Sequence, residues 1–304
     1  MGYEWEGEVV LQAEEAFALI EAQFPKLKPS SIQLLEVGWF NCAFLIDEKW
    51  VFKFPKNAQA AKFLERELLL LPIISSKLPL PVPVPQWEGA PAADFPWKFI
   101  GYEQLPGITA RKADLSEEER GATAEPLGHF LAKLHAIPLT EVDPTYSSPP
   151  KELTFAIDRK PLELVIEQHL QELGRLGLIT NQKQLREVVE IAFHLRFFPK
   201  IALIHNDFHM GHLLVNSRRQ LSGVIDWANA QFDETANDLS IAHILLPKHA
   251  HATFREAYGP ISEERWAFAK FSAVYVSLLT CLCAHQSKDA LLLKESIRAL
   301  KDIP

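Results

Sequence analysis

Two short apolar runs that lead into acidic residues constrain this chain more than any other feature. Residues 201–205 (IALIH) lead through Asn206 to Asp207, and residues 221–227 (LSGVIDW) contain Asp226. Each run has the length of a short strand, and side chains at the ends of neighbouring strands can converge on one site. A lone Asp after a strand is usually a turn or capping residue. Two of them at this spacing favour a functional site.

Phosphoryl transfer needs this kind of arrangement. It requires a carboxylate that orients and deprotonates the acceptor hydroxyl, and it requires ligands for the magnesium that bridges the phosphates. Asp207 suits the first task, and Asp226 together with His212 suits the second. Because magnesium prefers oxygen ligands, we expect the imidazole of His212 to contribute less than the carboxylate of Asp226.

Four separated motifs carry a family resemblance. The stretch HNDFHMGHLL, with the later GVIDWANAQFDETANDLS, resembles the aminoglycoside phosphotransferase family, whose loop has His-x-Asp followed five residues on by Asn or His. His at that position and the His-Asn-Asp-Phe opening are closest to the aminoglycoside 2″-phosphotransferase branch, and macrolide phosphotransferases share the His. Upstream, WVFKFPK, KLPLPVPVP and FIGYEQLPG are similar to the N-lobe of that branch. The resemblance covers roughly residues 36–240, with the motifs in the right order.

The resemblance implies an α+β, protein-kinase-like fold with two lobes. Residues 1–105 would form a small nucleotide-binding N-lobe with an antiparallel sheet. Residues 106–304 would form a mostly helical C-lobe with the catalytic loop and the acceptor-binding helices. Lys53 matches the strand lysine that holds the nucleotide phosphates. A lysine on an apolar strand needs an acidic partner, and the following helix offers Glu67, which the family pattern favours, and Glu65 as the alternative.

Further matched positions complete the implied site. Residues 38–41 stand where the phosphate-covering loop belongs, so Asn41 is assigned to nucleotide binding, although repeated glycines are missing. The hinge that would bind the nucleotide base through its backbone falls on Tyr102, Glu103, Gln104 and Leu105. Backbone contacts do not depend on side chains, so ATP and GTP remain alternatives. His205 and Asp238 are assigned structural roles beside the site, with Asp238 anchoring the catalytic loop, and Asp233 is interpreted as a turn residue.

Apolar periodicity gives the expected elements. The expected helices cover 11–24, 60–71 (ending before Pro72), 124–136, 161–176 and 184–197, and the chain is helical again from about 238; the expected strands cover 32–37, 43–54 (with a turn at Asp47-Glu48), 97–105 and one short hairpin around the catalytic loop. This order of helix, strands, helix, strands and a helical half is that of a two-lobed kinase fold.

Composition excludes several other classes. The net charge is −8, with 28 acids against 21 bases before His205 and 11 against 10 from there on, so we expect no nucleic-acid partner. The longest apolar run, residues 271–284, is shorter than the roughly 20 residues of a membrane span, which favours a buried helix and no membrane partner. Three irregularly spaced cysteines and no secretory signal favour the cytoplasm. We expect a monomer.

Other classes of site fit the residues less well. His205, His209 and His212 lack the HExxH spacing and a clear third ligand for zinc, and neither G-x-S-x-G nor G-x-G-x-x-G is present. An antibiotic of the aminoglycoside type is the acceptor that the family implies. A macrolide or other less charged hydroxyl compound, a sugar or amino alcohol, and a nucleotide-binding pseudokinase scaffold are the alternatives.

The acceptor half of the chain favours a less charged compound. Aminoglycosides are polycations, and their site should present several carboxylates. Residues 241–256 contain no acid before Glu256, and the helix over 271–284 is apolar. Asp158, Glu163 and Glu167 are the acids that could still reach the acceptor.

Overall fold

The computed structural model describes residues 9–38, 40–143, 159–196 and 199–303, and the chain divides into two compact units. The first unit contains Met1–Ser76, Pro81–Pro106 and Ile225–Asn229, and the second contains Lys77–Leu80, Gly107–Val224 and Ala230–Pro304. Apart from two short segments, the chain passes from the first unit to the second after Pro106. No sequence pattern indicated that the segment with Asp226 packs with the first unit.

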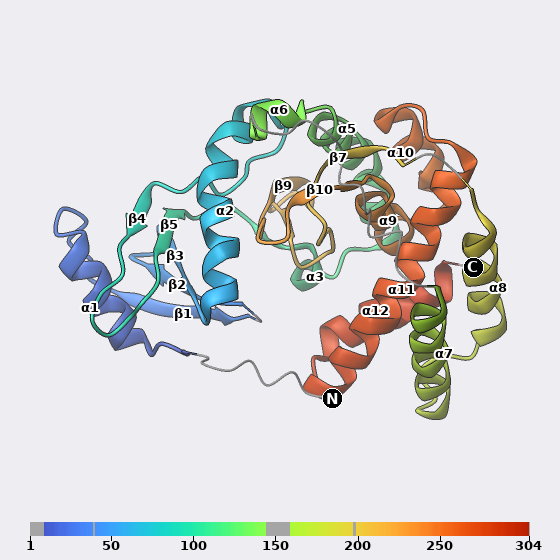
Figure 1. The fold of residues 1–304 in the computed structure, drawn as a ribbon, viewed down its shortest axis with the longest axis horizontal. Coiled ribbons are helices and arrows are strands. Elements are labelled where there is room, and N and C mark those ends of the chain that lie inside the picture. The colour runs from blue at the N-terminus through green and yellow to red at the C-terminus, as the bar shows by residue number, and fades with distance from the viewer. Residues whose placement is uncertain (1–8, 39, 144–158, 197–198, 304) are drawn as a thin grey trace. The chain divides into compact units, whose positions relative to one another are not determined.

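The first unit is built on a five-stranded antiparallel sheet in the order β1-β2-β3-β5-β4 (Figure 1). Its elements are α1 (Ala13–Gln23), β1 (Ile32–Val37), β2 (Asn41–Ile46), β3 (Trp50–Pro55), α2 (Ala58–Ile74), the 3₁₀ turn η1 (Ser75–Lys77), β4 (Trp87–Gly89) and β5 (Phe99–Glu103). The expected turn inside 43–54 is present, and Asp47 and Glu48 both adopt positive φ there. Aromatic rings fill the core beneath α1, including Phe44, Phe52 and Phe99.

Helix α2 corrects one expectation. It does not end before Pro72 but continues to Ile74, with Pro72 inside it. Proline removes only one backbone donor, and the last turns bury Leu70, Leu71 and Ile74, so apolar packing holds the helix past the proline.

The second unit is mostly helical. Its elements are β6 (Ile108–Thr109), α3 (Ala110–Ala113), α4 (Glu117–Ala122), α5 (Ala124–His135), α6 (Leu139–Val142), α7 (Arg159–Arg175), α8 (Gln182–His194), β7 (Ile201–Ile204), β8 (Leu213–Val215), β9 (Leu221–Val224), β10 (Gln231–Glu234), α9 (Ala236–Leu245), the 3₁₀ turn η3 (Lys248–Ala250), α10 (His251–Tyr258), α11 (Glu263–Ser287) and α12 (Ala290–Asp302). The single hairpin expected around the catalytic loop is in fact two small sheets. β7 pairs with β10, and β9 pairs with β8, which also pairs with β6.

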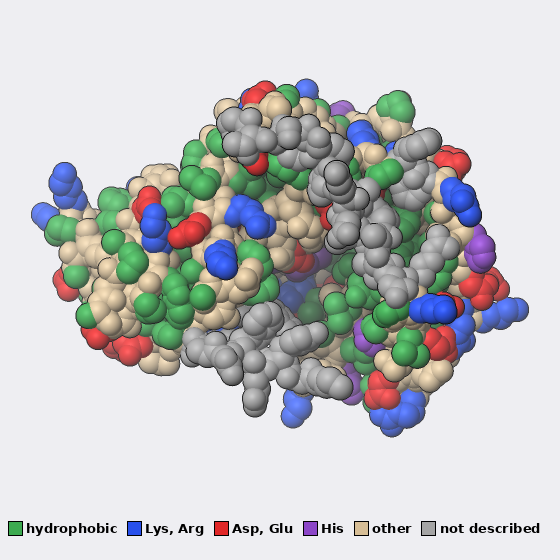
Figure 2. All heavy atoms as spheres, in the orientation of Figure 1, with side chains coloured by type: hydrophobic (Ala, Val, Ile, Leu, Met, Phe, Trp, Pro, Cys, Tyr) green, Lys and Arg blue, Asp and Glu red, His purple; other side chains and the backbone are tan. Residues whose placement is uncertain are grey.

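Helix α11 is long and apolar enough to cross a membrane by length and composition. In the structure half of that apolar stretch is buried, and α11 packs against α7, α8, α9 and α12 (Figure 1). Phe271, Val274, Leu278 and Cys281 lie in this helical core. On the face drawn in Figure 2, acidic and basic side chains are interspersed.

A buried histidine, His243, and a half-buried one, His251, lie where α9, α10 and α11 meet. The ring of His243 lies 5.0 Å from that of His251 and 4.4 Å from that of Trp266. Burial, reinforced by the charges of His251 and Lys270, holds the pKa of His243 well below its usual range, and burial also lowers the pKa of His251. Both rings are therefore neutral in the folded protein at a pH where the unfolded chain already binds protons.

We predict that acid destabilises the fold through this pair. Above about pH 7 both rings are neutral in the folded and unfolded chain. As the pH falls below about 6.5, only the unfolded chain takes up these protons, so the free energy of unfolding decreases by up to about 1.4 kcal/mol per pH unit for each proton. Urea unfolding at slightly alkaline and at mildly acidic pH should show a smaller pH effect in His243→Phe, which keeps a ring against Trp266. The exposed His249→Gln is the control, and equal pH effects in all three proteins would contradict the prediction.

Candidate active site

The first unit holds Lys53 between two carboxylates. Its Nζ lies 2.7 Å from Oε1 of Glu67 and 3.0 Å from Oδ1 of Asp226. Lys53 is in the middle of β3, which buries its side chain, and Glu67 lies on the inward face of α2 and is fully buried. Glu65, the alternative partner, is exposed on the other face of that helix. The helical periodicity of α2 thus decides which acid meets the lysine.

The two carboxylates keep the ammonium group of Lys53 charged. Burial alone would lower the pKa of Lys53, but the carboxylates of Asp226 and Glu67 outweigh it and hold that pKa above its ordinary value. Burial also raises the pKa of Tyr102. A fixed, fully charged ammonium group next to an acid on a strand end can hold phosphate oxygens. Asp226 itself adopts φ 63°, a left-handed conformation that Asp tolerates better than most residues.

The turn expected to cover the phosphates is tied to its own sheet. The backbone N–H of Gly38 donates to the carbonyl of Asn41 at 2.9 Å, and Nζ of Lys56 donates to the carbonyl of Gly38 at 3.1 Å. Asn41 is buried at the start of β2, and among the described residues its side-chain oxygen has no hydrogen-bond partner. A buried amide oxygen without a partner is costly unless a ligand or water satisfies it. This is consistent with a polar ligand at Asn41.

The four residues where the hinge is expected, from Tyr102 to Leu105, include the last two residues of β5 and the two that follow it. Tyr102 is buried, and Glu103 is exposed. The backbone N–H of Gln104 donates to the carbonyl of Lys49 at 2.7 Å, so it is already used within the sheet. Leu105 is half-buried just before the end of this part of the first unit. The N–H of Gln104 is therefore already satisfied and would not donate to a nucleotide base.

In the second unit, Asp238 organises the loop that carries Asp207. Its carboxylate accepts the backbone N–H groups of His205 and Asn206, each at 2.8 Å. It also accepts Nε2 of His135 at 3.1 Å, and Nδ1 of that ring lies 3.0 Å from the hydroxyl of Tyr258. Asp238 is fully buried, and it is held through these bonds by α5 and α10 as well as by its own helix.

His205 and Asn206 shape the loop between Asp238 and Asp207. Nδ1 of His205 accepts the backbone N–H of Asp207 at 3.3 Å, and the ring is fully buried. Asn206 adopts φ 61°, which Asn tolerates better than most residues. The backbone therefore reverses at Asn206 and presents Asp207, whose side chain is part exposed.

The rings of His209 and His212 flank Asp207, and their tautomers follow from backbone partners. Nδ1 of His212 lies 2.8 Å from the carbonyl of Asp207, which can only accept, so this nitrogen carries the proton. Nδ1 of His209 accepts the N–H of Gly211 at 2.9 Å, so in the neutral ring the proton lies on Nε2. The lone pair of His212 is thus on Nε2, the nitrogen turned away from the loop carbonyl.

These tautomers decide what the side chains can ligate. Asp207, His209 and His212 place possible ligand atoms within 4.8 Å of one another. Asp207 would thus be the third ligand for which the sequence gave no indication. A zinc ion would nevertheless require Nε2 of His209 to lose its proton while Nδ1 still accepts Gly211. His212 fits a cation better, because its Nδ1–H is fixed and its Nε2 carries a lone pair, as in metal-bound histidine. For magnesium, the carboxylate of Asp226 is the harder and more suitable ligand.

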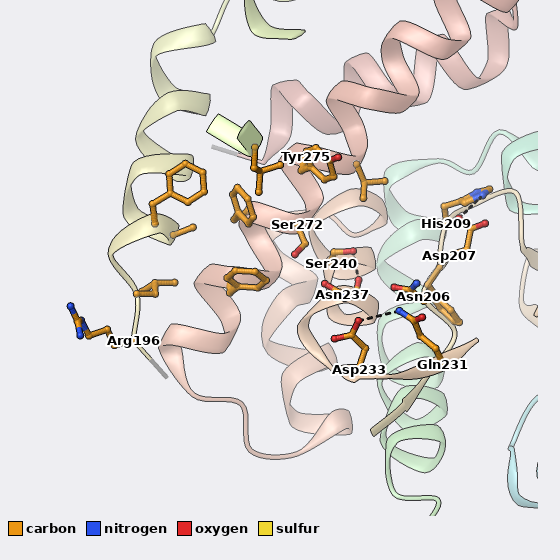
Figure 3. A pocket seen from close by; sticks show the side chains of 18 residues that line it. Arg196, Asn206, Asp207, His209, Gln231, Asp233, Asn237, Ser240, Ser272 and Tyr275 are labelled. Atoms are coloured by element: carbon orange, nitrogen blue, oxygen red, sulfur yellow. Dashed lines mark hydrogen bonds and ion pairs between the residues drawn. The ribbon is translucent and has the colours of Figure 1, made fainter. Parts of the chain in front are cut away.

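A cavity of about 420 Å³ opens beside Asp207 in the second unit (Figure 3). Its described lining combines aromatic and aliphatic side chains with an equal number of polar ones: Leu162, Ala192, Phe193, Leu195, Arg196, Asn206, Asp207, Phe208, His209, Gln231, Asp233, Asn237, Ser240, Phe268, Phe271, Ser272, Tyr275 and Val276. Figure 3 shows Asp207 and His209 together on one side of the cavity, and Ser272 and Tyr275 on α11. A cavity of this size and lining suits a small molecule.

Two residues of this cavity differ from what the sequence indicated. Asp233, interpreted as a turn residue, lies on β10, is buried and lines the cavity, with Oδ2 accepting Nε2 of Gln231 at 3.0 Å. His209, for which the sequence indicated no role, also lines it. The HxDxH spacing was the only signal for His209. Glu163 is exposed, Glu167 pairs with Arg186 at 2.8 Å, and Asp158 lies outside the described residues.

Comparison with known proteins assigns the chain to a family. The model of the family described as "Phosphotransferase enzyme family" (APH) matches residues 31–271. This chain belongs to that family. A relative in Bacillus subtilis (strain 168), "Uncharacterized protein YcbJ", is 22% identical over 264 residues and covers 83% of each chain. The family assignment made from the sequence motifs is confirmed.

Solved structures of the family share the fold. The GDP complex of wild-type aminoglycoside 2'-phosphotransferase-IIIa superposes with a TM-score of 0.69 at 21% identity, over 96% of this chain and 98% of that one. Macrolide 2'-phosphotransferase type I gives 0.60 at 18% identity, over 96% and 98%. At these identities the likeness concerns the fold alone, and it confirms the expected α+β, kinase-like architecture.

We predict that Lys53→Met destabilises the protein strongly, because it leaves the fully buried carboxylate of Glu67 without its cation. Removing one partner of a buried pair costs about 3–5 kcal/mol. The double variant Lys53→Met/Glu67→Leu should lose less than the sum of the two single variants, as measured by urea unfolding. Lys98→Met, which breaks the part-exposed pair with Glu88, is the control and should change the free energy of unfolding little. If Lys53→Met lowered the free energy of unfolding no more than Lys98→Met does, the pairing of Lys53 with Glu67 would be refuted.

Proposed function

We propose that this protein transfers the γ-phosphate of ATP or GTP to a hydroxyl group of a small molecule. The observation that carries the proposal is Asp207, a carboxylate on an anchored loop, at the wall of a cavity of about 420 Å³. Family membership supports the reaction class, and the GDP bound in the solved aminoglycoside phosphotransferase supports a purine nucleotide as donor.

Each of the chain's own groups has one part in the proposed reaction. The acceptor hydroxyl would lie in the cavity with its proton directed at the carboxylate of Asp207. As the hydroxyl oxygen bonds to the γ-phosphorus, the bond from that phosphorus to the bridging oxygen breaks, and the proton passes to Asp207. Lys53 holds phosphate oxygens in the first unit. Magnesium, for which Asp226 beside Lys53 is the candidate ligand in the first unit, would neutralise phosphate charge when bound.

The cavity favours a weakly charged acceptor over a polycation. Among the described lining residues the acids are Asp207, which is committed to catalysis, and Asp233, and Arg196 adds a positive charge. Rings of Phe193, Phe268 and other residues make up much of the remaining wall. Several ammonium groups would lack carboxylate partners there, whereas a body with apolar faces and hydroxyl groups would match both the rings and the uncharged polar side chains of the wall. A macrolide-type compound is thus the better candidate, and an aminoglycoside the second.

A pseudokinase scaffold is the alternative of a different class. It is disfavoured because Lys53, Asp207 and Asp226 are all present and Lys53 has both acidic partners. We also propose that the protein is a cytoplasmic monomer with no nucleic-acid or membrane partner. Light scattering after size exclusion would test the oligomeric state.

We predict that Asp207→Asn lowers kcat by about 10²–10⁴-fold, because the amide cannot accept the hydroxyl proton. Nucleotide affinity should stay nearly unchanged, because the amide preserves the shape of the loop. Nucleotide consumption with ATP and with GTP, together with titration of a fluorescent nucleotide analogue, measures the two effects. Asp114→Asn, at an exposed ion pair with Lys294, is the matched control. If Asp207→Asn kept the full kcat, Asp207 would not be the base.

We predict a higher kcat/KM for a macrolide acceptor than for a kanamycin-type acceptor, by about tenfold or more, since uncompensated ammonium groups cost roughly 1 kcal/mol or more each on desolvation. Phe193→Ala should lower kcat/KM for the macrolide, because it removes part of the apolar wall. Side-by-side kinetics settle the order, and efficient use of kanamycin with no macrolide turnover would reverse it.

A further inference from the structure

His209 has a defined environment that the proposed reaction does not yet use. It lies two residues after Asp207, lines the same cavity and is less than one-third exposed. Its Nε2 is 3.6 Å from Oδ1 of Asp207, and its ring centre is 3.9 Å from that of His212. A histidine on a surface loop often has no role, but a surface ring is free to rotate, and this one is fixed on two sides.

Hydrogen bonding fixes which nitrogen faces the carboxylate. The backbone N–H of Gly211 always donates, so Nδ1 of His209 must accept, and the neutral ring carries its proton on Nε2. The nitrogen turned toward Asp207 is therefore a donor. A separation of 3.6 Å is too long for a hydrogen bond, but catalytic hydrogen bonds are commonly long without substrate and shorten in the complex.

The ring of His209 also packs closely against Gly211. A Cβ at Gly211 would lie 2.6 Å from Cε1 and 3.0 Å from Nδ1 of His209. The backbone of Gly211 does not have a positive φ, so another residue could adopt it. A side chain at position 211 would therefore take up the space of the imidazole, and the ring of His209 would have to move.

We propose that His209 is a positioning residue for the transfer reaction, donating from Nε2 to Oδ1 of Asp207 so that Oδ2 accepts the proton of the hydroxyl group. This inference rests on the proposed function of Asp207 as the base. A carboxylate on a part-exposed loop can rotate about its side-chain bonds, and a donor fixed beside Oδ1 limits that rotation. Oδ2 lies 3.8 Å from Nδ1 of His212, whose proton is directed at the backbone carbonyl of Asp207. Misplacement of a reacting group by about 1 Å can cost about 100-fold in rate.

The test uses side chains that mimic one ring nitrogen at a time. The amide nitrogen of Gln can take the place of Nε2, whereas that of Asn reaches only the position of Nδ1. We expect His209→Asn and His209→Leu to lower kcat by about 10- to 100-fold, and His209→Gln to recover most of it. The KM for nucleotide and the melting temperature should change little in all three. Exposed His249→Gln is the control for a histidine beside an acid.

A double-variant cycle tests the contact with Gly211. Gly211→Ala should lower kcat by displacing the ring, and it should have no further effect in the His209→Leu background. If Gln, Asn and Leu at position 209 give equal kcat, or if the effects of Gly211→Ala and His209→Leu simply multiply, the inference is wrong. If Asp207→Asn retains full activity, the proposed function fails instead, whatever the variants at position 209 show.

Discussion

The arrangement of the second unit depends on one buried carboxylate. Asp238 accepts the N–H groups of His205 and Asn206 and the Nε2 of His135, and it is fully buried. A buried charge is costly unless hydrogen bonds satisfy it, and three donors together with the N-terminal turn of α9 do so here. The same bonds compensate the loop backbone, whose positive φ at Asn206 would otherwise be unfavourable. The hydrogen bonds that anchor the loop at His205 and Asn206 are therefore the same ones that stabilise the buried charge of Asp238.

The first unit solves the corresponding problem with a cation. Lys53 can be buried only because Glu67 and Asp226 neutralise it, and Glu67 can be fully buried only because Lys53 is 2.7 Å away. Buried pairs of this kind often add little net stability compared with apolar residues. Their value here is positional, since the pair fixes the register of α2 against β3 and directs the ammonium group to one place. The second unit contains a similar buried ion pair, in which Nε of Arg265 lies 2.6 Å from Oε1 of the fully buried Glu234.

The family motifs predicted more of the site than the residues alone did. The residues left both Glu65 and Glu67 as partners for Lys53, and the family pattern favoured Glu67; the helical period of α2 explains that choice, because it buries Glu67 and exposes Glu65. Asp238 was assigned to the loop from its family match. The interpretation of Asp233 was wrong because strand β10 is only four residues long and pairs with β7, a partner that a short apolar run does not identify. The orientation of His209 could not be predicted because it depends on the N–H of Gly211, and backbone donors have no signature in the sequence.

The site separates a fixed part from a variable one. The loop is held by hydrogen bonds between backbone and buried polar groups, which demand particular residues and distances. The opposite cavity wall comes from α8 and α11, where Phe193 and Phe271 lie at the edge of a helical core held by apolar packing. Apolar packing tolerates exchange of residues of similar volume far better than a hydrogen-bond network does. Substitutions in that wall can therefore change which molecule the cavity fits without moving Asp207, so the fold constrains the loop more tightly than the cavity wall.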